Sequence, residues 1–406
     1  MMKSTLKKIV VVVLAVALAS MVLAACGGGN GGNGGNGGGG EQPAGDSGYT
    51  ANNTKFVLGA SGPLTGGAAI YGIAVQNSAQ MAVDEINAAG GINGVEIEFR
   101  MLDDMHDATK VKTNFSSLYE GGMQVSLGCV TSAPGQEWTN LSHETPVFFI
   151  TPSASNDDIP KYDNGYQMCF ADGNQGLYAA GYVNDNYAGQ TIGIFYKSDD
   201  NYSSGIYDTF MANLDPSIQV VETTFTGDAS TFDSQIQQLK DCKFIFMPIY
   251  YTPASQFMIQ AKGTIADDAI YFGCDGFDGI DSGIEGFDIT TIPQEVSMLS
   301  HFDSKASAGA EKDYIDKYVA AYGADTLNQF GASAYDCVYA IAKAMTENAD
   351  KVSVTMSAEE LNEVLKAAFQ EMTFTGVTGG GQPITWDENG YVNKSAVKYT
   401  IKEANK

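Results

Sequence analysis

The sequence predicts an α/β protein with two lobes, each built on a doubly wound parallel β-sheet. Short apolar segments typical of buried strands alternate with segments of helical periodicity. The alternation runs from residue 56 to residue 150 and begins again near residue 175. Roughly 350 residues follow a glycine-rich tract, which is more than one hydrophobic core usually organises, so two domains are expected.

The first series of elements begins with a buried strand at 56–60 and turn-forming residues at 61–67. A helix is expected at 71–88, because apolar residues recur at helical spacing from Val75 to Ile86 and two glycines follow. The remaining elements expected in this series are strands at 95–102, 125–129 and 147–150, and helices at 108–120 and 138–144.

The second series repeats this order and ends in three long helices. Its expected helices are at 175–187, 203–212, 232–240, 255–261, 310–322, 333–348 and 358–369, and its strands are at 191–196, 220–224, 244–249 and 269–272. Strands separated by helices indicate parallel sheets with right-handed crossovers. Ligands bind beyond the carboxyl ends of such strands. The loops after residues 60, 129, 150, 196, 249 and 272 are therefore the candidate functional segments.

The first 25 residues are typical of a secretory signal peptide. Three lysines precede an apolar run at 9–23, and Ala24-Ala25-Cys26 supplies the small residues of a cleavage site. A cysteine at this position resembles the lipobox of bacterial lipoproteins, which implies that the Cys26 thiol is acylated and that Cys26 becomes the first residue of the processed protein. A membrane-spanning anchor is the alternative, but the apolar run is short for the ~20 residues of a spanning helix.

Residues 27–40 contain only glycine and asparagine. Such a segment cannot bury apolar surface, so residues 26–53 are expected to form a flexible linker with an end-to-end distance of about 30 Å. The chain carries a formal net charge of −26, and removal of residues 1–25, which hold three lysines and no acid, changes it to −29. This charge disfavours nucleic acid and anionic lipid headgroups as partners.

Five cysteines follow Cys26, and none belongs to a C-x-x-C pair. They are Cys129, Cys169, Cys242, Cys274 and Cys337. An exported protein can form disulfides, but the sequence leaves their connectivity open. Because five is an odd number, at least one of these cysteines is unpaired within the chain. The alternative to a disulfide is that the cysteines are buried free thiols.

Several motifs together resemble one family. They are GPLTG at 62–66, YG at 71–72, AVDEINAAGGING at 82–94, SDDNYSSG at 198–205 and ITWDENG at 384–390. From about residue 55 to its end, the chain is similar to the leucine/isoleucine/valine-binding family of ABC-transporter substrate-binding proteins.

That resemblance implies the type 1 periplasmic binding protein fold, in which three chain crossings join two lobes and the ligand lies in the cleft between them. The crossings are expected near Asp172, Phe302 and Val392. Lobe 1 would comprise residues 54–171 and 303–391, and lobe 2 residues 172–302 and 392–406.

The resemblance also implies ligand-binding residues in lobe 1. Ser132 and Ser155 match hydroxyl residues that bind the carboxylate of an amino acid, and Ser153 matches a backbone carbonyl that faces its ammonium group. Tyr71 matches an aromatic residue of the side-chain pocket. Turn capping is the alternative role for the three serines.

In lobe 2, Tyr202 matches a tyrosine that closes over the ligand backbone. Asp275 matches the acid that pairs with the ammonium, although the branched-chain protein has the longer Glu there, and Asp172 matches a second acid nearby. A solvated loop is the alternative for both acids. Tyr250 and Tyr251 fall where the family has an aromatic contact, and which of them faces the cleft stays open.

The sequence does not indicate an enzyme. Its three histidines lack zinc-site spacing, and neither a G-x-S-x-G motif nor a phosphate-binding loop is present. We expect no catalytic residues, metal or cofactor.

The resemblance implies a lipid-anchored extracytoplasmic protein that delivers a small amino acid, branched-chain or otherwise apolar, to the permease and ATPase of an ABC importer. We expect a monomer. Two alternatives are a ligand-sensing ectodomain that signals to a membrane partner, and a binding protein for another solute such as an amide or an aromatic acid.

Overall fold

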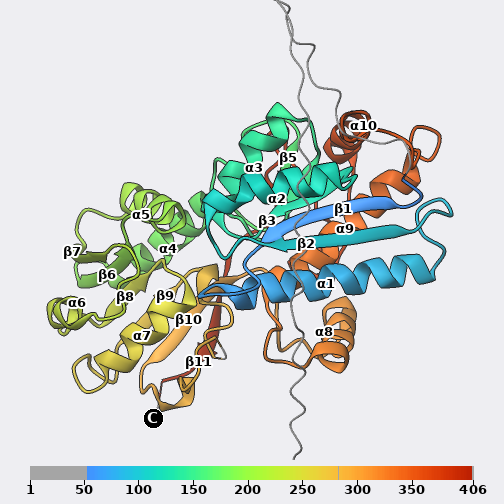
Figure 1. Cartoon of the computed structure of the whole chain (residues 1–406). Coiled ribbons are helices and arrows are strands. Elements are labelled where there is room, and N and C mark those ends of the chain that lie inside the picture. The colour runs from blue at the N-terminus through green and yellow to red at the C-terminus, as the bar shows by residue number, and fades with distance from the viewer. Residues whose placement is uncertain (1–52, 282, 405–406) are drawn as a thin grey trace, which may run out of the picture. The chain divides into compact units, whose positions relative to one another are not determined.

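The computed structural model describes residues 53–281 and 283–404, so the predicted signal peptide, Cys26 and the linker up to residue 52 lie outside the described residues. The described chain contains two β-sheets (Figure 1). The first has the strand order β2-β1-β3-β4-β5 and the second has the order β11-β10-β9-β8-β6-β7. The strands of the first sheet are β1 (Phe56–Gly62), β2 (Ile97–Asp103), β3 (Val125–Cys129), β4 (Phe149–Thr151) and β5 (Gly165–Gln167).

The second sheet is formed later in the chain. Its strands are β6 (Thr191–Lys197), β7 (Gln219–Phe225), β8 (Phe244–Met247), β9 (Ile270–Gly273), β10 (Glu295–Ser300) and β11 (Val397–Lys402). The strand pairs of both sheets are parallel, apart from the antiparallel pair β10–β11. The predicted fold class, α/β with two parallel sheets, is confirmed.

Helices cover both sheets. Those associated with the first sheet are α1 (Ala69–Ala88), α2 (Ala108–Glu120), α3 (Ser132–Glu144), α8 (Gly309–Tyr322), α9 (Gln329–Glu347) and α10 (Ala358–Glu371). Those associated with the second are α4 (Asp172–Tyr187), α5 (Asn201–Asn213), α6 (Asp233–Leu239) and α7 (Tyr251–Ala261). Helices α1 and α9 lie side by side although more than 200 residues separate them (Figure 1).

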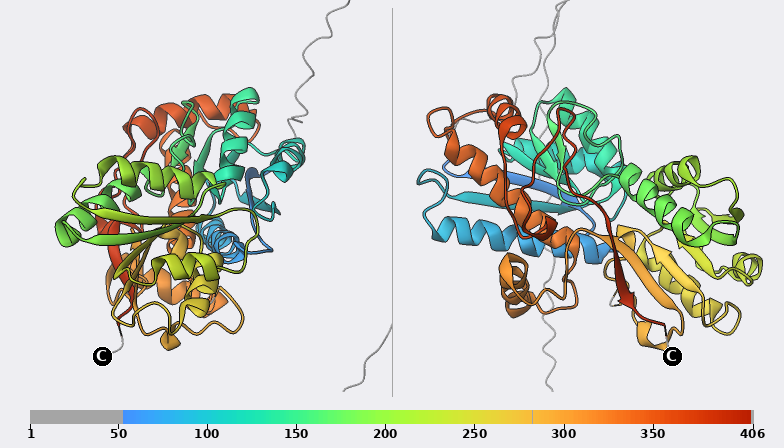
Figure 2. Two further views of the ribbon diagram at one scale, coloured as in Figure 1. Left: turned by 90° about the vertical axis from the view of Figure 1, so that its left-hand side faces the viewer. Right: turned by 180° about the vertical axis from the view of Figure 1, so that it is seen from behind.

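The chain passes between the two sheets more than once. It leaves β5 for α4, returns from β10 to α8, and runs from α10 back to β11. Figure 2 shows this last passage from behind, where the C-terminal segment in red leads away from α10 to β11. The residue boundaries given above for the two lobes stay a prediction.

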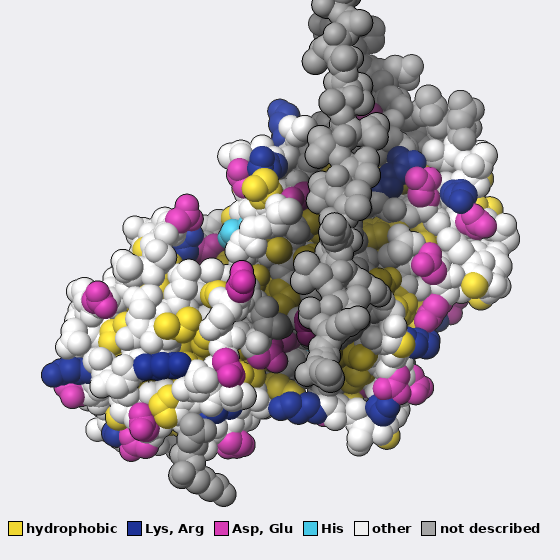
Figure 3. All heavy atoms as spheres, turned by 60° about the horizontal axis from the view of Figure 1, so that its bottom comes forward, with side chains coloured by type: hydrophobic (Ala, Val, Ile, Leu, Met, Phe, Trp, Pro, Cys, Tyr) yellow, Lys and Arg dark blue, Asp and Glu magenta, His cyan; other side chains and the backbone are white. Residues whose placement is uncertain are grey.

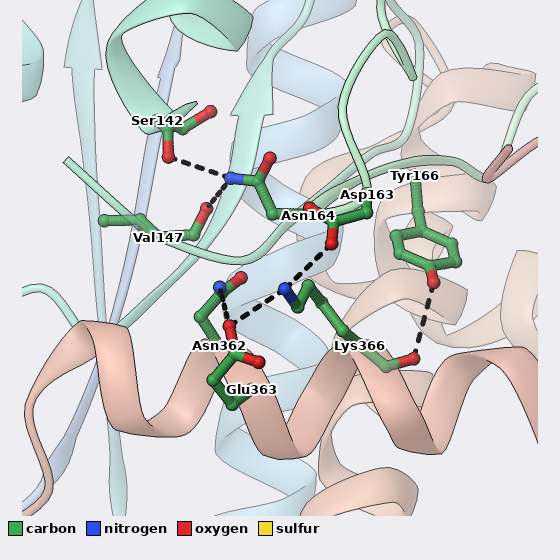
Figure 4. Close-up of polar contacts among 8 residues, drawn as sticks. All are labelled: Ser142, Val147, Asp163, Asn164, Tyr166, Asn362, Glu363 and Lys366. Atoms are coloured by element: carbon green, nitrogen blue, oxygen red, sulfur yellow. Dashed lines mark hydrogen bonds and ion pairs between the residues drawn. The ribbon is translucent and has the colours of Figure 1, made fainter. Parts of the chain in front are cut away.

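Polar contacts hold α10 beside the edge of the first sheet (Figure 4). The Lys366 ammonium pairs with Asp163 at 2.9 Å and with Glu363 at 2.8 Å. Next to this pair, the Asn164 side-chain amide donates to the carbonyl oxygens of Ser142 at 2.8 Å and Val147 at 3.0 Å. The loop before β5 therefore links α3 to α10 and fixes this end of the sheet.

Three strands were not predicted, and three helices, α3, α7 and α9, begin four or more residues before their predicted starts. The strands are β5, β10 and β11. Helix α3 begins at Ser132 rather than at residue 138, α7 at Tyr251 rather than 255, and α9 at Gln329 rather than 333. Pro134 suits the first turn of α3, because a residue there needs no intrahelical hydrogen bond from its backbone nitrogen. The antiparallel strand β11 alternates apolar and polar residues, a signal that could have identified it.

All five cysteines after Cys26 are buried free thiols, so the described chain contains no disulfide.

No helix within residues 53–281 and 283–404 has the length and apolar character that a bilayer crossing requires. Figure 3 shows acidic side chains spread over one face of the molecule with basic ones between them, rather than gathered into one patch.

Candidate functional site

A small cavity lies where loops from the two sheets meet. It has room for about one water molecule, so a larger ligand would require its walls to move apart. It is lined by Tyr71, Val130, Thr131, Ser132, Ser153, Ser155, Tyr202, Tyr250, Asp275, Gly276 and Phe330. Seven of the eight predicted ligand-binding residues are in this lining. The eighth, Asp172, lies next to it, since its backbone nitrogen donates to the Ser155 carbonyl oxygen at 2.7 Å.

Hydroxyl groups come from the loops after β3 and β4. Ser132 is the first residue of α3, so free backbone N–H groups of that helix start lie beside its side chain. Its Oγ accepts a hydrogen bond from the Asn156 nitrogen at 3.3 Å, which ties the two loops together. Thr151 Oγ1 accepts hydrogen bonds from the nitrogens of Ser153 and Ala154 and shapes the second loop. Hydroxyls beside a helix N-terminus suit a carboxylate ligand.

Asp275 lies directly after β9 and is almost fully buried. Its Oδ1 accepts a hydrogen bond from the Tyr202 hydroxyl at 2.7 Å, and its nitrogen donates to Gln175 Oε1 at 2.9 Å. Its Oδ2 is buried and has no partner among the described residues. Burial raises the pKa of Asp275 to about 6, although the hydrogen bonds from Tyr202 and Gln175 oppose that shift.

Asp172 begins α4 and is fully buried. Its Oδ1 accepts a long hydrogen bond of 3.4 Å from the Gln175 side chain, and its Oδ2 also lacks a partner in the described part of the chain. Burial, and then the charge of Asp275, raise the pKa of Asp172 well above its ordinary value. Two buried carboxyl groups with unpartnered oxygens favour a ligand that brings a positive charge.

Aromatic rings form the remaining walls. The Tyr71 hydroxyl donates to the Gly276 carbonyl oxygen at 2.6 Å, and its ring lies edge-on to Phe330 with centroids 4.9 Å apart. Tyr250 stacks on Tyr202 with centroids 4.7 Å apart. Tyr250, and not Tyr251, therefore lines the cavity, which answers the question that the sequence left open.

The sequence prediction missed Val130, Thr131, Gly276 and Phe330. Gly276 is required by close packing, because a Cβ there would lie 2.8 Å from both the Tyr202 hydroxyl and the Ile249 carbonyl oxygen. Phe330 enters from the start of α9, far along the chain, and no local motif marks it. Val130 and Thr131 adjoin Ser132 and could have been found from the position of the loop after β3.

Direct hydrogen bonds join the two sides around the cavity. The Thr252 hydroxyl donates to the Gly67 carbonyl oxygen at 2.7 Å, and the Gln329 nitrogen donates to Asp278 Oδ2 at 2.9 Å. The Asn201 side-chain amide donates to Gln136 Oε1 at 2.5 Å. The described structure therefore has the loops of both sheets in contact, which is a closed arrangement of the site.

A larger cavity lies beside the crossing segments and is lined by residues from 300–303, 379–384 and 393–399 together with Glu311. Its walls are mainly apolar, and its buried cation, Lys394, already donates to the Thr378 hydroxyl. The small cavity combines hydroxyls, unpartnered carboxyl oxygens and aromatic walls. This convergence of polar groups, more than volume, identifies the small cavity as the candidate site.

Sequence comparisons place the chain among solute-binding proteins. A family model described as "Periplasmic binding protein" matches residues 55–405. The chain is 26% identical over 358 residues to the leucine-, isoleucine-, valine-, threonine- and alanine-binding protein of Pseudomonas aeruginosa, covering 86% of this chain and 90% of that protein. It is 28% identical over 262 residues to a Leu/Ile/Val-binding protein of Rhizobium johnstonii, covering 62% and 71% of the two chains.

Solved structures show the same architecture. The substrate-binding protein LivJ of the branched-chain amino acid transporter of Streptococcus pneumoniae, in complex with isoleucine, has a TM-score of 0.71 at 26% identity. That match covers 85% of this chain and all of LivJ. A solute-binding protein of R. palustris in complex with benzoate has a TM-score of 0.71 at 16% identity, over 86% of this chain and 93% of that one. This second likeness extends to the fold alone.

Proposed function

Because the chain belongs to the periplasmic binding protein family, we propose that it is the solute-binding component of an ABC importer and that the small cavity holds a free amino acid. The predicted resemblance to the leucine/isoleucine/valine-binding proteins is confirmed by the relatives above. Binding a solute for transport requires no chemistry, and members of this family are not enzymes.

One observation carries the choice of ligand. Asp275 and Asp172 are both buried, and each has an oxygen without a partner in the described structure. An ammonium group would supply the missing hydrogen bonds and offset the cost of burying the two acids. The hydroxyls of Ser132 and Ser155, together with the start of α3, are the groups that would bind the ligand carboxylate.

The side-chain pocket supports an apolar amino acid. Tyr71, Phe330 and Val130 line it, and the lining contains no lysine or arginine. We propose a branched-chain or other apolar amino acid, held by residues of both sheets at once. Closing of the two sides is then favoured by the ligand, since only the closed arrangement brings both sets of residues into contact with it.

An aromatic carboxylate is the second candidate, because four aromatic rings line the cavity and a related fold holds benzoate. Two buried acids with unpartnered oxygens disfavour it, because benzoate carries no ammonium group to pair with them. A ligand-sensing ectodomain would use the same cavity. Deletion of a neighbouring permease gene distinguishes the two functions, because it would abolish uptake of the ligand only if the protein serves an importer.

Attachment to the membrane through a lipid on Cys26, export by residues 1–25 and a monomeric state belong to this proposal. Metabolic labelling with palmitate tests the anchor. The wild-type protein is expected to incorporate the label and Cys26→Ser is expected to lose it, whereas labelling of both proteins would remove Cys26 as the acceptor.

Titration calorimetry of the purified protein against the free amino acids and against benzoate tests the ligand. We expect binding of one or more apolar amino acids and no heat from benzoate. Binding of benzoate without any amino acid would reverse the choice of ligand class.

A further inference from the structure

The loop after β2 has an unusual backbone. Met105 and His106 are consecutive non-glycine residues with positive φ values of 57° and 61°. This left-handed region is unfavourable for side chains with a Cβ and is found where the surrounding structure enforces it. Here Asp103 Oδ1 accepts from the Met105 nitrogen and Asp104 Oδ1 accepts from the His106 nitrogen, both at 2.9 Å.

The acid that enforces this turn is itself fixed. Asp104 is fully buried, and its Oδ2 accepts a hydrogen bond from the Ser61 hydroxyl at 2.9 Å. Ser61 belongs to β1, which lies between β2 and β3 in the first sheet. The position of the His106 backbone is therefore tied to the rigid part of the first sheet.

The strained turn places the His106 ring against two residues of the cavity wall. Its Nδ1 is 2.9 Å from Thr131 Oγ1, which belongs to the side of the first sheet. Its ring packs edge-on against Tyr250, on the side of the second sheet, with centroids 5.2 Å apart and an interplanar angle of 81°. His106 is not in the lining itself, so it acts on the site through these two neighbours.

The position of Tyr250 depends on packing. Within the described residues, no hydrogen bond to another residue fixes its hydroxyl, and its ring lies between Tyr202 on one face and the His106 edge. Tyr71 lies farther away, with ring centroids 5.9 Å apart. Ring contacts with Tyr202 and His106 therefore hold the Tyr250 ring in its position.

We propose that His106 holds Tyr250 in place as one wall of the cavity and thereby limits the size of the ligand side chain that the closed site accepts. The inference rests on the proposed function, since it presumes an amino acid in the cavity. His106 is a positioning residue that sets specificity through Tyr250.

Charge supports a neutral packing role for this ring. Burial lowers the pKa of His106, an effect that Lys197 reinforces and that Asp200 and Asp107 oppose. The ring is therefore uncharged at neutral pH, and its edge-on contact with Tyr250 needs no counter-ion. Asp104 is the remaining acid of the loop that contacts His106, through the backbone nitrogen.

The test compares Kd values for alanine, leucine and phenylalanine by titration calorimetry on the full chain. His106→Asn removes the ring but keeps a residue that tolerates the left-handed backbone. His106→Phe keeps a ring against Tyr250. His143→Asn is the matched control, because the His143 ring also packs against a tyrosine, Tyr162, which is not part of the cavity lining.

We expect His106→Asn to reduce the ratio of the phenylalanine Kd to the alanine Kd by at least about fivefold, because a pocket enlarged by a few carbon atoms changes discrimination by such factors. His106→Phe is expected to restore most of the ratio, and His143→Asn to leave it unchanged. Protonation of Asp172 and Asp275 would weaken the binding of all three amino acids by the same factor. The ratio of the phenylalanine Kd to the alanine Kd therefore reports on the side-chain pocket and not on the groups that bind the ammonium.

An equal change in all three Kd values for His106→Asn, or no change, would overturn the inference, because a merely structural role weakens every ligand alike. If His106→Asn fails to fold, His106→Gly takes its place, because glycine adopts the left-handed backbone most readily; an equal change in all three Kd values for that variant likewise overturns the inference. A wild-type protein that binds none of the three would instead refute the proposed function on which the inference rests.

Discussion

At the scale of single residues, the site is organised by two acids that the fold removes from water. Asp275 and Asp172 come from different elements, η1 (Asp275–Phe277) and α4, and Gln175 contacts both of them. Burying a carboxylate without a cation is costly. A bound ammonium group would therefore offset the free-energy cost of burying these two carboxyl groups.

The substitution Asp275→Asn tests this arrangement. We expect affinity for the amino acid ligand to fall at least about 100-fold, since one partner of a buried charge pair is lost. We also expect the ligand-free protein to gain about 1–2 kcal/mol in its free energy of unfolding at neutral pH, because an uncompensated buried charge is removed. Calorimetry and denaturant unfolding measure the two effects. A loss of stability together with unchanged affinity would contradict the assigned role.

The pH dependence has opposite signs for stability and for binding. Burial raises the pKa of Asp275 to about 6 and raises that of Asp172 as well. The folded protein then holds protons that the unfolded chain has released, so the contribution of Asp275 to stability decreases as pH rises from about 4 to about 6, and the raised pKa of Asp172 gives a change of the same sign. Ligand binding requires the charged acids, so affinity should increase over the same rise.

Titration calorimetry at about pH 5, 6, 7 and 8 measures this profile. We expect the Kd at pH 5 to exceed that at pH 7 by roughly tenfold, because most Asp275 is protonated one unit below its pKa. Asp275→Asn supplies the control, since its remaining affinity should vary less with pH. A flat wild-type profile would show that neither acid pairs with the ligand.

Tyr71 links the two sides of the site through its hydroxyl, which donates to the Gly276 carbonyl oxygen. We expect Tyr71→Phe to weaken ligand binding about 5- to 10-fold, as a buried hydrogen bond that favours the closed arrangement is lost. The matched control is Tyr207→Phe, which removes a hydroxyl that donates to Glu222 on the surface of the second sheet. If Tyr71→Phe and the control bind the ligand with equal affinity, the Tyr71 hydrogen bond does not contribute to the stability of the closed arrangement.

At the scale of elements, the sequence allowed prediction of the helices and strands that have a clear pattern of apolar residues. Helix α1 and strands β1 and β6 were predicted within a few residues of their observed bounds, because α1 has apolar residues at helical spacing and the two strands are short, almost continuously buried segments. The strand β5 has three residues, too few for a periodic signal. The start of α3 was missed because proline and glycine in its first turn resemble a loop.

Individual residues of the cavity lining could be predicted from the sequence only where they belong to a local motif. Ser132, Ser155, Tyr202 and Asp275 lie in loops directly beyond strands or at helix starts, where a motif and a position coincide. Phe330 joins them through long-range packing of α9, and Tyr250 is selected over Tyr251 by the geometry of the turn into α7. No short stretch of sequence specifies such contacts, because they depend on the whole chain.

The helix α10 gives a test at this scale. It begins with a capping box, in which the Ser357 hydroxyl accepts from the Glu360 nitrogen and the Glu360 side chain accepts from the Ser357 nitrogen. We expect Ser357→Ala to lower the free energy of unfolding by about 1 kcal/mol and to leave ligand affinity unchanged. Ser353→Ala, in the preceding loop, is the control. A changed affinity for Ser357→Ala would mean that α10 influences the site.

At the scale of the whole molecule, the two sheets supply different halves of the candidate ligand site. The first sheet brings the hydroxyls of Ser132 and Ser155, and the second brings Tyr202 and Asp275. The closed arrangement has direct hydrogen bonds across the cleft as well, such as that from Thr252 to Gly67. A ligand that contacts both sides would add to these contacts and further stabilise the closed state.

The central claim is that the two buried acids bind the ammonium group of an amino acid. The most direct measurement is titration calorimetry of the wild-type protein with leucine and with 4-methylpentanoate, which has the same carbon skeleton and carboxylate but no amine. The proposed site predicts binding of leucine, or of another apolar amino acid tested with its own des-amino acid, and at least about 100-fold weaker binding of the des-amino compound. Equal binding of the two members of such a pair would contradict the account.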